Sequence, residues 1–100
     1  MKRTTFRVYS DPNCAWIKVP KLILDVYLGH RWRRHFTSFS REKGDFVYLE
    51  KGCDTANFDR LIKEAGIQPI YKEGSTCTTR FSRVRTYPPL GCFTPSPSRR

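Results

Sequence analysis

The first twenty residues alternate apolar and polar positions with the period of a β-strand. Phe6 and Val8 alternate with more polar neighbours between residues 4 and 10, which predicts a half-buried strand. The turn-forming sequence Asp-Pro-Asn follows, and residues 15–19 resume an extended pattern. We therefore expect a hairpin, or a strand followed by a short edge segment, that ends at Pro20.

Two later segments carry helical patterns. Residues 21–28 follow a proline, are apolar enough for a buried helical face and precede Gly29, a typical helix stop. A second helix is predicted near residues 55–65, with Asp54 or Thr55 as its N-cap and Gly66 at its end. Its buried stripe follows the i, i+3, i+4, i+7 spacing and consists of Phe58, Leu61, Ile62 and Ala65.

The remaining apolar runs predict strands. Residues 36–41 and 46–50 flank a glycine-bearing turn and are expected to form a hairpin. Residues 67–72 and 80–87 indicate two more strands, and Pro69 makes the first of these an edge or irregular strand. Together the patterns predict an α+β fold, in which a small, mainly antiparallel sheet of four to six strands carries two helices packed on one face.

The length of 100 residues fits one domain. Residues 88–100 contain four prolines among serines and arginines and few residues that form a core. We therefore expect a single α+β domain over residues 1–87 and a flexible Pro/Ser/Arg-rich tail over residues 88–100.

Charge is the strongest compositional feature. The chain has 19 Lys and Arg against 9 Asp and Glu, a formal net charge of +10, which favours nucleic acid or an acidic protein surface as partner. No run of apolar residues is long enough to cross a membrane, and the alternating N-terminus does not form a signal-peptide block. We expect a cytoplasmic protein without a membrane partner.

Cysteine spacing and motif content argue against a metal or a catalytic centre. No two of the four cysteines lie at the short spacing of zinc ligands, so we expect reduced thiols, no metal and no cofactor. No nucleophile elbow, zinc-protease, P-loop or dinucleotide motif occurs. Cys14 could pair with His30 or His35 only if distant segments met, so the sequence predicts a protein that is not an enzyme.

Residues 30–35 place three arginines around an aromatic residue directly after a helix stop. Arginine binds phosphates bidentately and an exposed tryptophan stacks on unpaired bases, so a nucleic-acid site is predicted here. The alternative is a tryptophan packed in the core, with arginines that solvate a linker. The candidate binding residues of this segment are Arg31, Trp32, Arg33 and Arg34.

A second basic segment has no acidic residue nearby. On a strand over 80–87, Phe81, Arg83, Arg85 and Tyr87 would share one face, which suits a phosphate backbone with stacked bases. The two aromatic residues could instead cover the core. The candidate binding residues here are Arg80, Arg83, Arg85 and Tyr87.

Three stretches carry a family resemblance: residues 16–20, residues 43–50 with the Cys-Asp pair at 53–54, and residues 80–87. Over most of residues 5–87 the chain resembles a group of small uncharacterised proteins encoded by phages and plasmids. The resemblance implies a mobile-element origin and no activity. The basic segment 30–35 and the proline-rich tail depart from the pattern of the group.

The sequence thus predicts a basic, non-enzymatic nucleic-acid-binding accessory protein, with DNA and RNA equally open. The alternative is a phage-encoded interaction protein that binds an acidic surface of a host protein, such as a defence nuclease or a polymerase. The first should bind oligonucleotides with a steep salt dependence, and the second should not.

Overall fold

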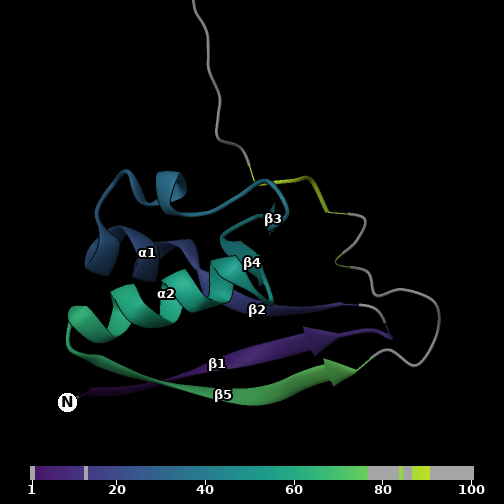
Figure 1. Ribbon diagram of the computed structural model, residues 1–100, viewed down its shortest axis with the longest axis horizontal. Helices are drawn as coiled ribbons and strands as arrows, with labels where there is room; N and C mark the ends of the chain where they lie inside the picture. Colours follow the sequence, from purple (N-terminus) through teal and green to yellow (C-terminus); the bar gives the residue numbers. More distant parts are fainter. Residues whose placement is uncertain (1, 13, 77–83, 85–86, 91–100) are drawn as a thin grey trace, which may run out of the picture.

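A computed structural model describes residues 2–12, 14–76, 84 and 87–90 of the chain. Five strands form one sheet in the order β3-β4-β2-β1-β5 (Figure 1). Strand β1 lies antiparallel to β2 and parallel to β5, and the other two pairings are antiparallel. The elements along the chain are β1 (Lys2–Ser10), β2 (Ala15–Pro20), α1 (Lys21–Leu28), the 3₁₀ helix η1 (Trp32–His35), β3 (Arg41–Lys43), β4 (Phe46–Glu50), α2 (Cys53–Glu64) and β5 (Ile67–Thr76).

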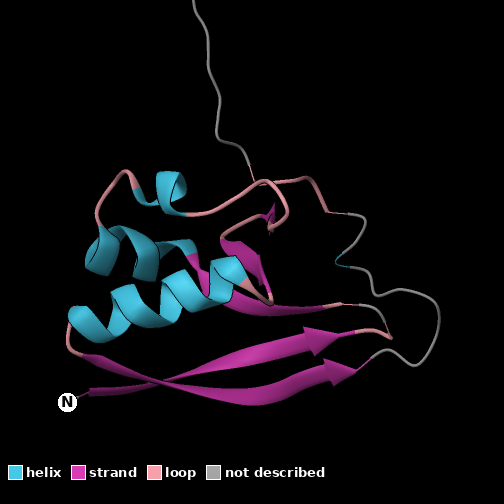
Figure 2. Cartoon of the chain, in the orientation of Figure 1, coloured by secondary structure: helices cyan, strands magenta, loops and turns pink. Residues whose placement is uncertain are grey.

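The helices lie together on one face of the sheet (Figure 2). Their buried side chains meet those of alternate strand positions, so the main core is a layer between helices and sheet. The core residues are Phe6, Ile17, Val19, Leu24, Trp32, Phe36, Val47, Leu49, Phe58, Ile62, Ile67 and Leu90. The predicted α+β class, the mainly antiparallel sheet and the helices on one face are confirmed.

Several local predictions are confirmed with small shifts. Helix α1 has the expected bounds and ends at Gly29, whose φ of 94° is a conformation that favours glycine. The hairpin at the glycine-bearing turn is β3-β4, but β3 begins only at Arg41, five residues later than the pattern at 36–41 suggested. Strand β5 contains Pro69 and lies at the edge of the sheet, as that proline indicated.

The predicted stripe of α2 is only half right. Phe58 and Ile62 are fully buried, whereas Leu61 is half-buried and Ala65, the C-cap, is exposed. The N-cap is Gly52, not Asp54 or Thr55. Helix α2 therefore contacts the sheet through Phe58 and Ile62, which lie four residues apart, and Leu61 lies at the edge of this contact.

The expected domain boundary after Tyr87 is too early. Leu90 is only 2 % exposed and its N–H donates to the carbonyl of Ser40 (2.7 Å). The N–H of Glu42 donates to the carbonyl of Pro88 (3.0 Å), and Pro89 forms a bridge with Arg41. Residues 88–90 thus pack along the outer edge of β3 because they supply hydrogen bonds that this edge strand otherwise lacks. The rest of the expected tail lies outside the described residues.

Within the described ranges, no helix has the length and apolar character needed to span a bilayer.

Candidate functional site

Helices α1, η1 and α2 all lie on one face of the sheet, and the strand positions of the second face are rich in basic residues. Phe6 and Val8 of β1 join the helix-side core, so Arg7 between them points to the opposite face. The same alternation places Lys18 of β2 there, since Ile17 and Val19 face the helices. We call this set the basic sheet face: Arg3, Arg7, Lys18, Lys43 and Lys72.

Strand register aligns three residues of this set, Arg7, Lys18 and Lys72, into one row across the sheet, which continues to Tyr48 and Arg41. Lys72 of β5 pairs with Arg7, and Arg7 pairs with Lys18. Lys18 pairs with Tyr48 of β4, and Tyr48 pairs with Arg41 of β3. Because directly paired residues point to the same face, four cations and one aromatic ring form a line perpendicular to the strands.

Aromatic rings flank the middle of the row. The Lys18 ammonium lies 4.2 Å from the ring centroid of Phe46 and 5.8 Å from that of Tyr9. Lys43 lies 4.9 Å from the ring of Tyr87. These cation–π contacts hold the ammonium groups over the sheet without neutralising them.

Acidic residues are almost absent from this face. Of the nine acidic residues of the chain, all of which the structure describes, only Glu50 occupies a strand position there, at the end of β4. No described carboxylate lies within ion-pair distance of the five cations of the basic sheet face. A polyanion would therefore meet uncompensated positive charge on this side of the molecule.

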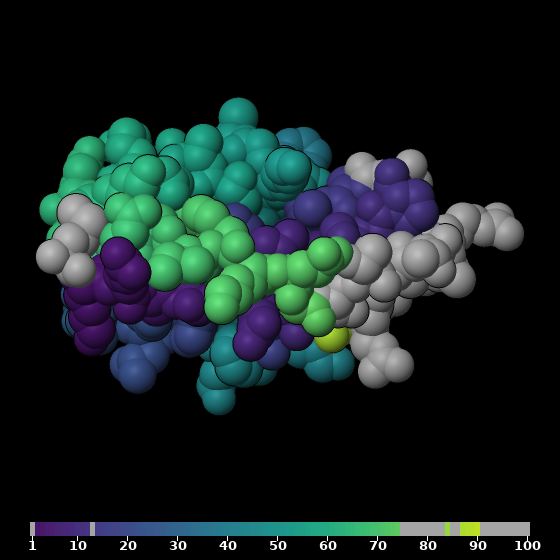
Figure 3. All heavy atoms as spheres, turned by 90° about the horizontal axis from the view of Figure 1, so that it is seen from below, coloured from purple at the N-terminus to yellow at the C-terminus, as the bar shows by residue number. Residues whose placement is uncertain are grey.

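One end of the basic row is covered by residues near the C-terminus. Val84 and Tyr87 pack on Trp16 and Tyr48, and the Tyr48 and Tyr87 rings lie 5.0 Å apart. Burial, with the neighbouring tyrosines, raises the pKa of Tyr48 to about 12. The Arg41 guanidinium donates to the carbonyl of Tyr87 (3.1 Å). The accessible part of the row is therefore on β5, β1 and β2. Figure 3 looks at the β5 edge of the sheet and shows α2 along the upper side of this strand.

The structure removes Trp32 from the predicted binding residues. Its side chain is only 4 % exposed, its indole N–H donates to Asp25 (3.1 Å), and the Arg33 guanidinium covers its ring at 4.6 Å. Arg33 itself makes a bidentate ion pair with Glu42, at 2.9 and 3.0 Å. The Glu42 carboxylate also pairs with Lys21, at 2.8 Å. Tryptophan is here a core residue, so the prediction that it stacks on bases is wrong.

The other predicted residues have different outcomes. Arg31, the N-cap residue of η1, and Arg34 within η1 are exposed. Tyr87 is half-buried, and its ring contacts both the Tyr48 ring and the Lys43 ammonium. Arg80, Arg83 and Arg85 lie outside the described residues, as does most of the strand expected over 80–87. The candidate residues predicted from the sequence do not include Arg3, Arg7, Lys18 and Lys72, although the alternation in residues 3–9 places Arg3 and Arg7 opposite Phe6.

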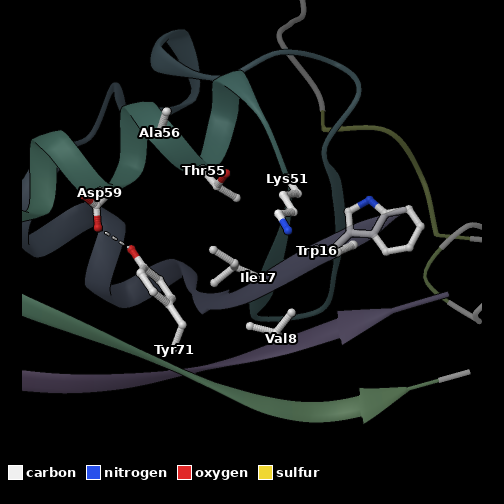
Figure 4. A pocket seen from close by; sticks show the side chains of 9 residues that line it. Val8, Trp16, Ile17, Lys51, Thr55, Ala56, Asp59 and Tyr71 are labelled. Carbon is white, nitrogen blue, oxygen red and sulfur yellow. Dashed lines mark hydrogen bonds between the residues drawn. The ribbon is translucent and has the colours of Figure 1, made fainter. Parts of the chain in front are cut away.

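A hollow of about 450 Å³ lies between α2 and strands β1, β2 and β5 (Figure 4). Tyr71 points from β5 toward α2, and its hydroxyl donates to Asp59 (2.8 Å). Burial raises the pKa of the Asp59 carboxyl, but the hydrogen bonds from Lys63 and Tyr71 outweigh it, so the net effect is a lowered pKa. Burial and the bond to Asp59 raise the pKa of Tyr71. Tyr71, Asp59 and Lys63 are thus joined to one another at the wall of this hollow.

The buried carboxylate of Asp54 holds the loop before β3 by hydrogen bonds. It accepts hydrogen bonds from the Thr37 N–H (3.0 Å), the Thr37 hydroxyl (2.8 Å) and the Ser40 hydroxyl. It thereby fixes the loop between η1 and β3 to the first turn of α2. Among the described residues, no group of three or more His, Cys, Asp and Glu side chains is arranged to hold a metal ion.

No family model, curated protein or solved structure matches the chain. The resemblance to phage- and plasmid-encoded proteins therefore stays an expectation.

Proposed function

We propose that the protein binds single-stranded nucleic acid on its basic sheet face, as a non-enzymatic accessory protein of the cell interior. The observation that carries the proposal is the row Lys72-Arg7-Lys18, which crosses three adjacent strands and has no described carboxylate in contact. Strands lie about 4.8 Å apart, so the row presents closely spaced cations to a phosphate backbone.

The aromatic residues favour single strands over duplex. Tyr9 and Phe46 are half-buried rings on either side of Lys18. Unpaired bases stack on such rings, which contributes about 1–3 kcal/mol per base, whereas paired bases are not accessible for stacking. A sheet face with rings and cations is an arrangement that single-stranded RNA and DNA readers use.

The test is the triple variant Arg7→Ala, Lys18→Ala, Lys72→Ala. Binding of a fluorescein-labelled single-stranded oligonucleotide of mixed sequence is followed by anisotropy over a series of salt concentrations. Each phosphate contact contributes about 0.7 to the slope of log K against log salt for single strands. The salt slope of the variant should be smaller by up to about 2. Its affinity for the oligonucleotide at moderate salt should be lower by about tenfold or more.

The matched control removes the same charge from elsewhere. Lys51→Ala, Arg60→Ala, Lys63→Ala takes three exposed cations from α2 and the turn before it. Its salt slope should stay close to that of the wild type. Equal losses in both variants would mean that only net charge matters, and an absence of oligonucleotide binding by the wild type at low salt would favour an acidic protein surface as the partner.

A further inference from the structure

The exposed arginines of η1 lie on the opposite side of the sheet from the basic sheet face. Trp32 and Phe36, at the start and just after the end of η1, are buried in the helix-side core with Leu24, Phe58 and Ile62. Figure 1 shows η1 beside α1, within the helix layer. Strands β2 and β4 and their core side chains therefore separate η1 from the basic sheet face.

The side chains at η1 divide into those that are held by other residues and those that point outward. Arg31 is the N-cap residue of η1 and Arg34 lies three residues later in the chain, and both line the same hollow. Trp32 is held inward by its bond to Asp25, and Arg33 is held by Glu42. What remains outward is the set His30, Arg31 and Arg34, which lines a hollow of about 550 Å³ together with Arg33 and Phe36. We call this the η1 cluster.

The two arginines of the η1 cluster, Arg31 and Arg34, have no carboxylate partner among the described residues. Asp25 lies 3.8 Å from His30 and accepts the indole N–H of Trp32. Glu42 is shared by Lys21 and Arg33. In the part of the chain that the structure describes, no acidic side chain is within ion-pair distance of Arg31 or Arg34. Two guanidinium groups around a hollow suit a phosphate group, which accepts bidentate hydrogen bonds from arginine.

We propose that the η1 cluster is a second, independent phosphate-binding site, and that one molecule therefore joins two separate nucleic-acid strands. This inference rests on the proposed function of the basic sheet face. A strand bound across β5, β1 and β2 runs on the far side of the sheet from Arg31 and Arg34, so a different strand fills the second site. The protein would then bridge two nucleic-acid strands and would not only coat a single strand.

Strand capture tests the proposal. One biotinylated oligonucleotide is fixed on streptavidin beads, the protein is added, and retention of a second, non-complementary fluorescent oligonucleotide is measured. The variant Arg31→Ala, Arg34→Ala should still bind the first strand within about threefold of the wild type, but should retain the second strand about tenfold less. The control Arg60→Ala, Lys63→Ala loses the same charge from α2 and should retain both strands.

Each outcome separates this inference from the proposed function. If the wild type binds the fixed strand and never retains the second, bridging is refuted and single-strand binding stands. If the Arg31→Ala, Arg34→Ala variant still bridges, the two strands are joined by pairing of protein molecules and the η1 cluster is not the second site. If the wild type binds no strand at all, the proposed function fails first.

Discussion

The replacement Asp54→Ala should destabilise the domain strongly, because it removes the acceptor of three donors. The Thr37 N–H, the Thr37 hydroxyl and the Ser40 hydroxyl all donate to this carboxylate, and Asp54 and Ser40 are buried. Leaving the buried Ser40 hydroxyl without a partner costs about 1–3 kcal/mol. Thr37 is exposed, so water replaces part of its two bonds, and each of these contributes about 0.5–1.5 kcal/mol. Together we expect a loss of about 3–5 kcal/mol from a total stability of about 5–15 kcal/mol.

Thermal unfolding measures this loss directly. For a domain of this size, 1 kcal/mol shifts the midpoint by about 4–8 °C, so Asp54→Ala should lower Tm by about 12 °C or more. Asp54→Asn keeps the shape and one acceptor oxygen and should lower Tm about half as much. The control Asp45→Asn changes an exposed turn residue and should lower Tm by about 2 °C at most.

A local measurement identifies the mechanism. The Thr37 amide donates to both oxygens of Asp54, at 3.0 and 3.1 Å. Its hydrogen exchange should therefore speed up in Asp54→Ala more than that of amides in the centre of the sheet. A Tm within about 3 °C of the wild type would refute the argument that this carboxylate holds the loop to α2.

Three further predictions concern stability. Phe58→Ala should lower the free energy of unfolding, measured in urea, by about 3–5 kcal/mol. Leu61→Ala should lower it clearly less, because only Phe58 is fully buried, and equal losses would contradict the observed contact of α2 with the sheet. Leu90→Ala should cost about 2–5 kcal/mol by the same measurement, whereas a negligible loss would restore the boundary at Tyr87. The raised pKa of Tyr48, about 12 against an ordinary 10, means that the folded state holds its proton longer than the unfolded state. The resulting stability is present below pH 10 and is lost as pH rises toward 12, and Tyr48→Phe should weaken this loss in alkaline melts.

Local patterns predicted most of the secondary structure because each element carries its own signal. Helix α1 lies between Pro20 and Gly29, and the hairpin β3-β4 surrounds Gly44 with a φ of 59°. The pairing of β1 with β5 has no such signal, since it joins segments that are far apart in the chain. Leu90 was missed for a similar reason, because a lone leucine among prolines shows no period.

The sequence shows the composition of the basic sheet face but not its position in the fold. Basic charge and interspersed aromatic residues are visible in the sequence, and the expectation of a polyanion partner rests on them. Trp32 was misjudged because its burial depends on Asp25 and on the core below α1, contacts made only in the folded chain. The row Lys72-Arg7-Lys18 could be found only from the strand register, which the sequence leaves open.

The parallel pairing of β1 with β5 has a consequence for how the chain folds. Lys2 pairs with Ile67 and Arg7 with Lys72, so nearly the whole described chain must be closed into a loop before this contact forms. Such distant pairings slow folding, because the entropy of loop closure is lost before the contact stabilises the chain. During synthesis β1 waits for β5 to be made. The surface that carries Arg7 next to Lys72 therefore assembles only after residue 72 has been added to the chain.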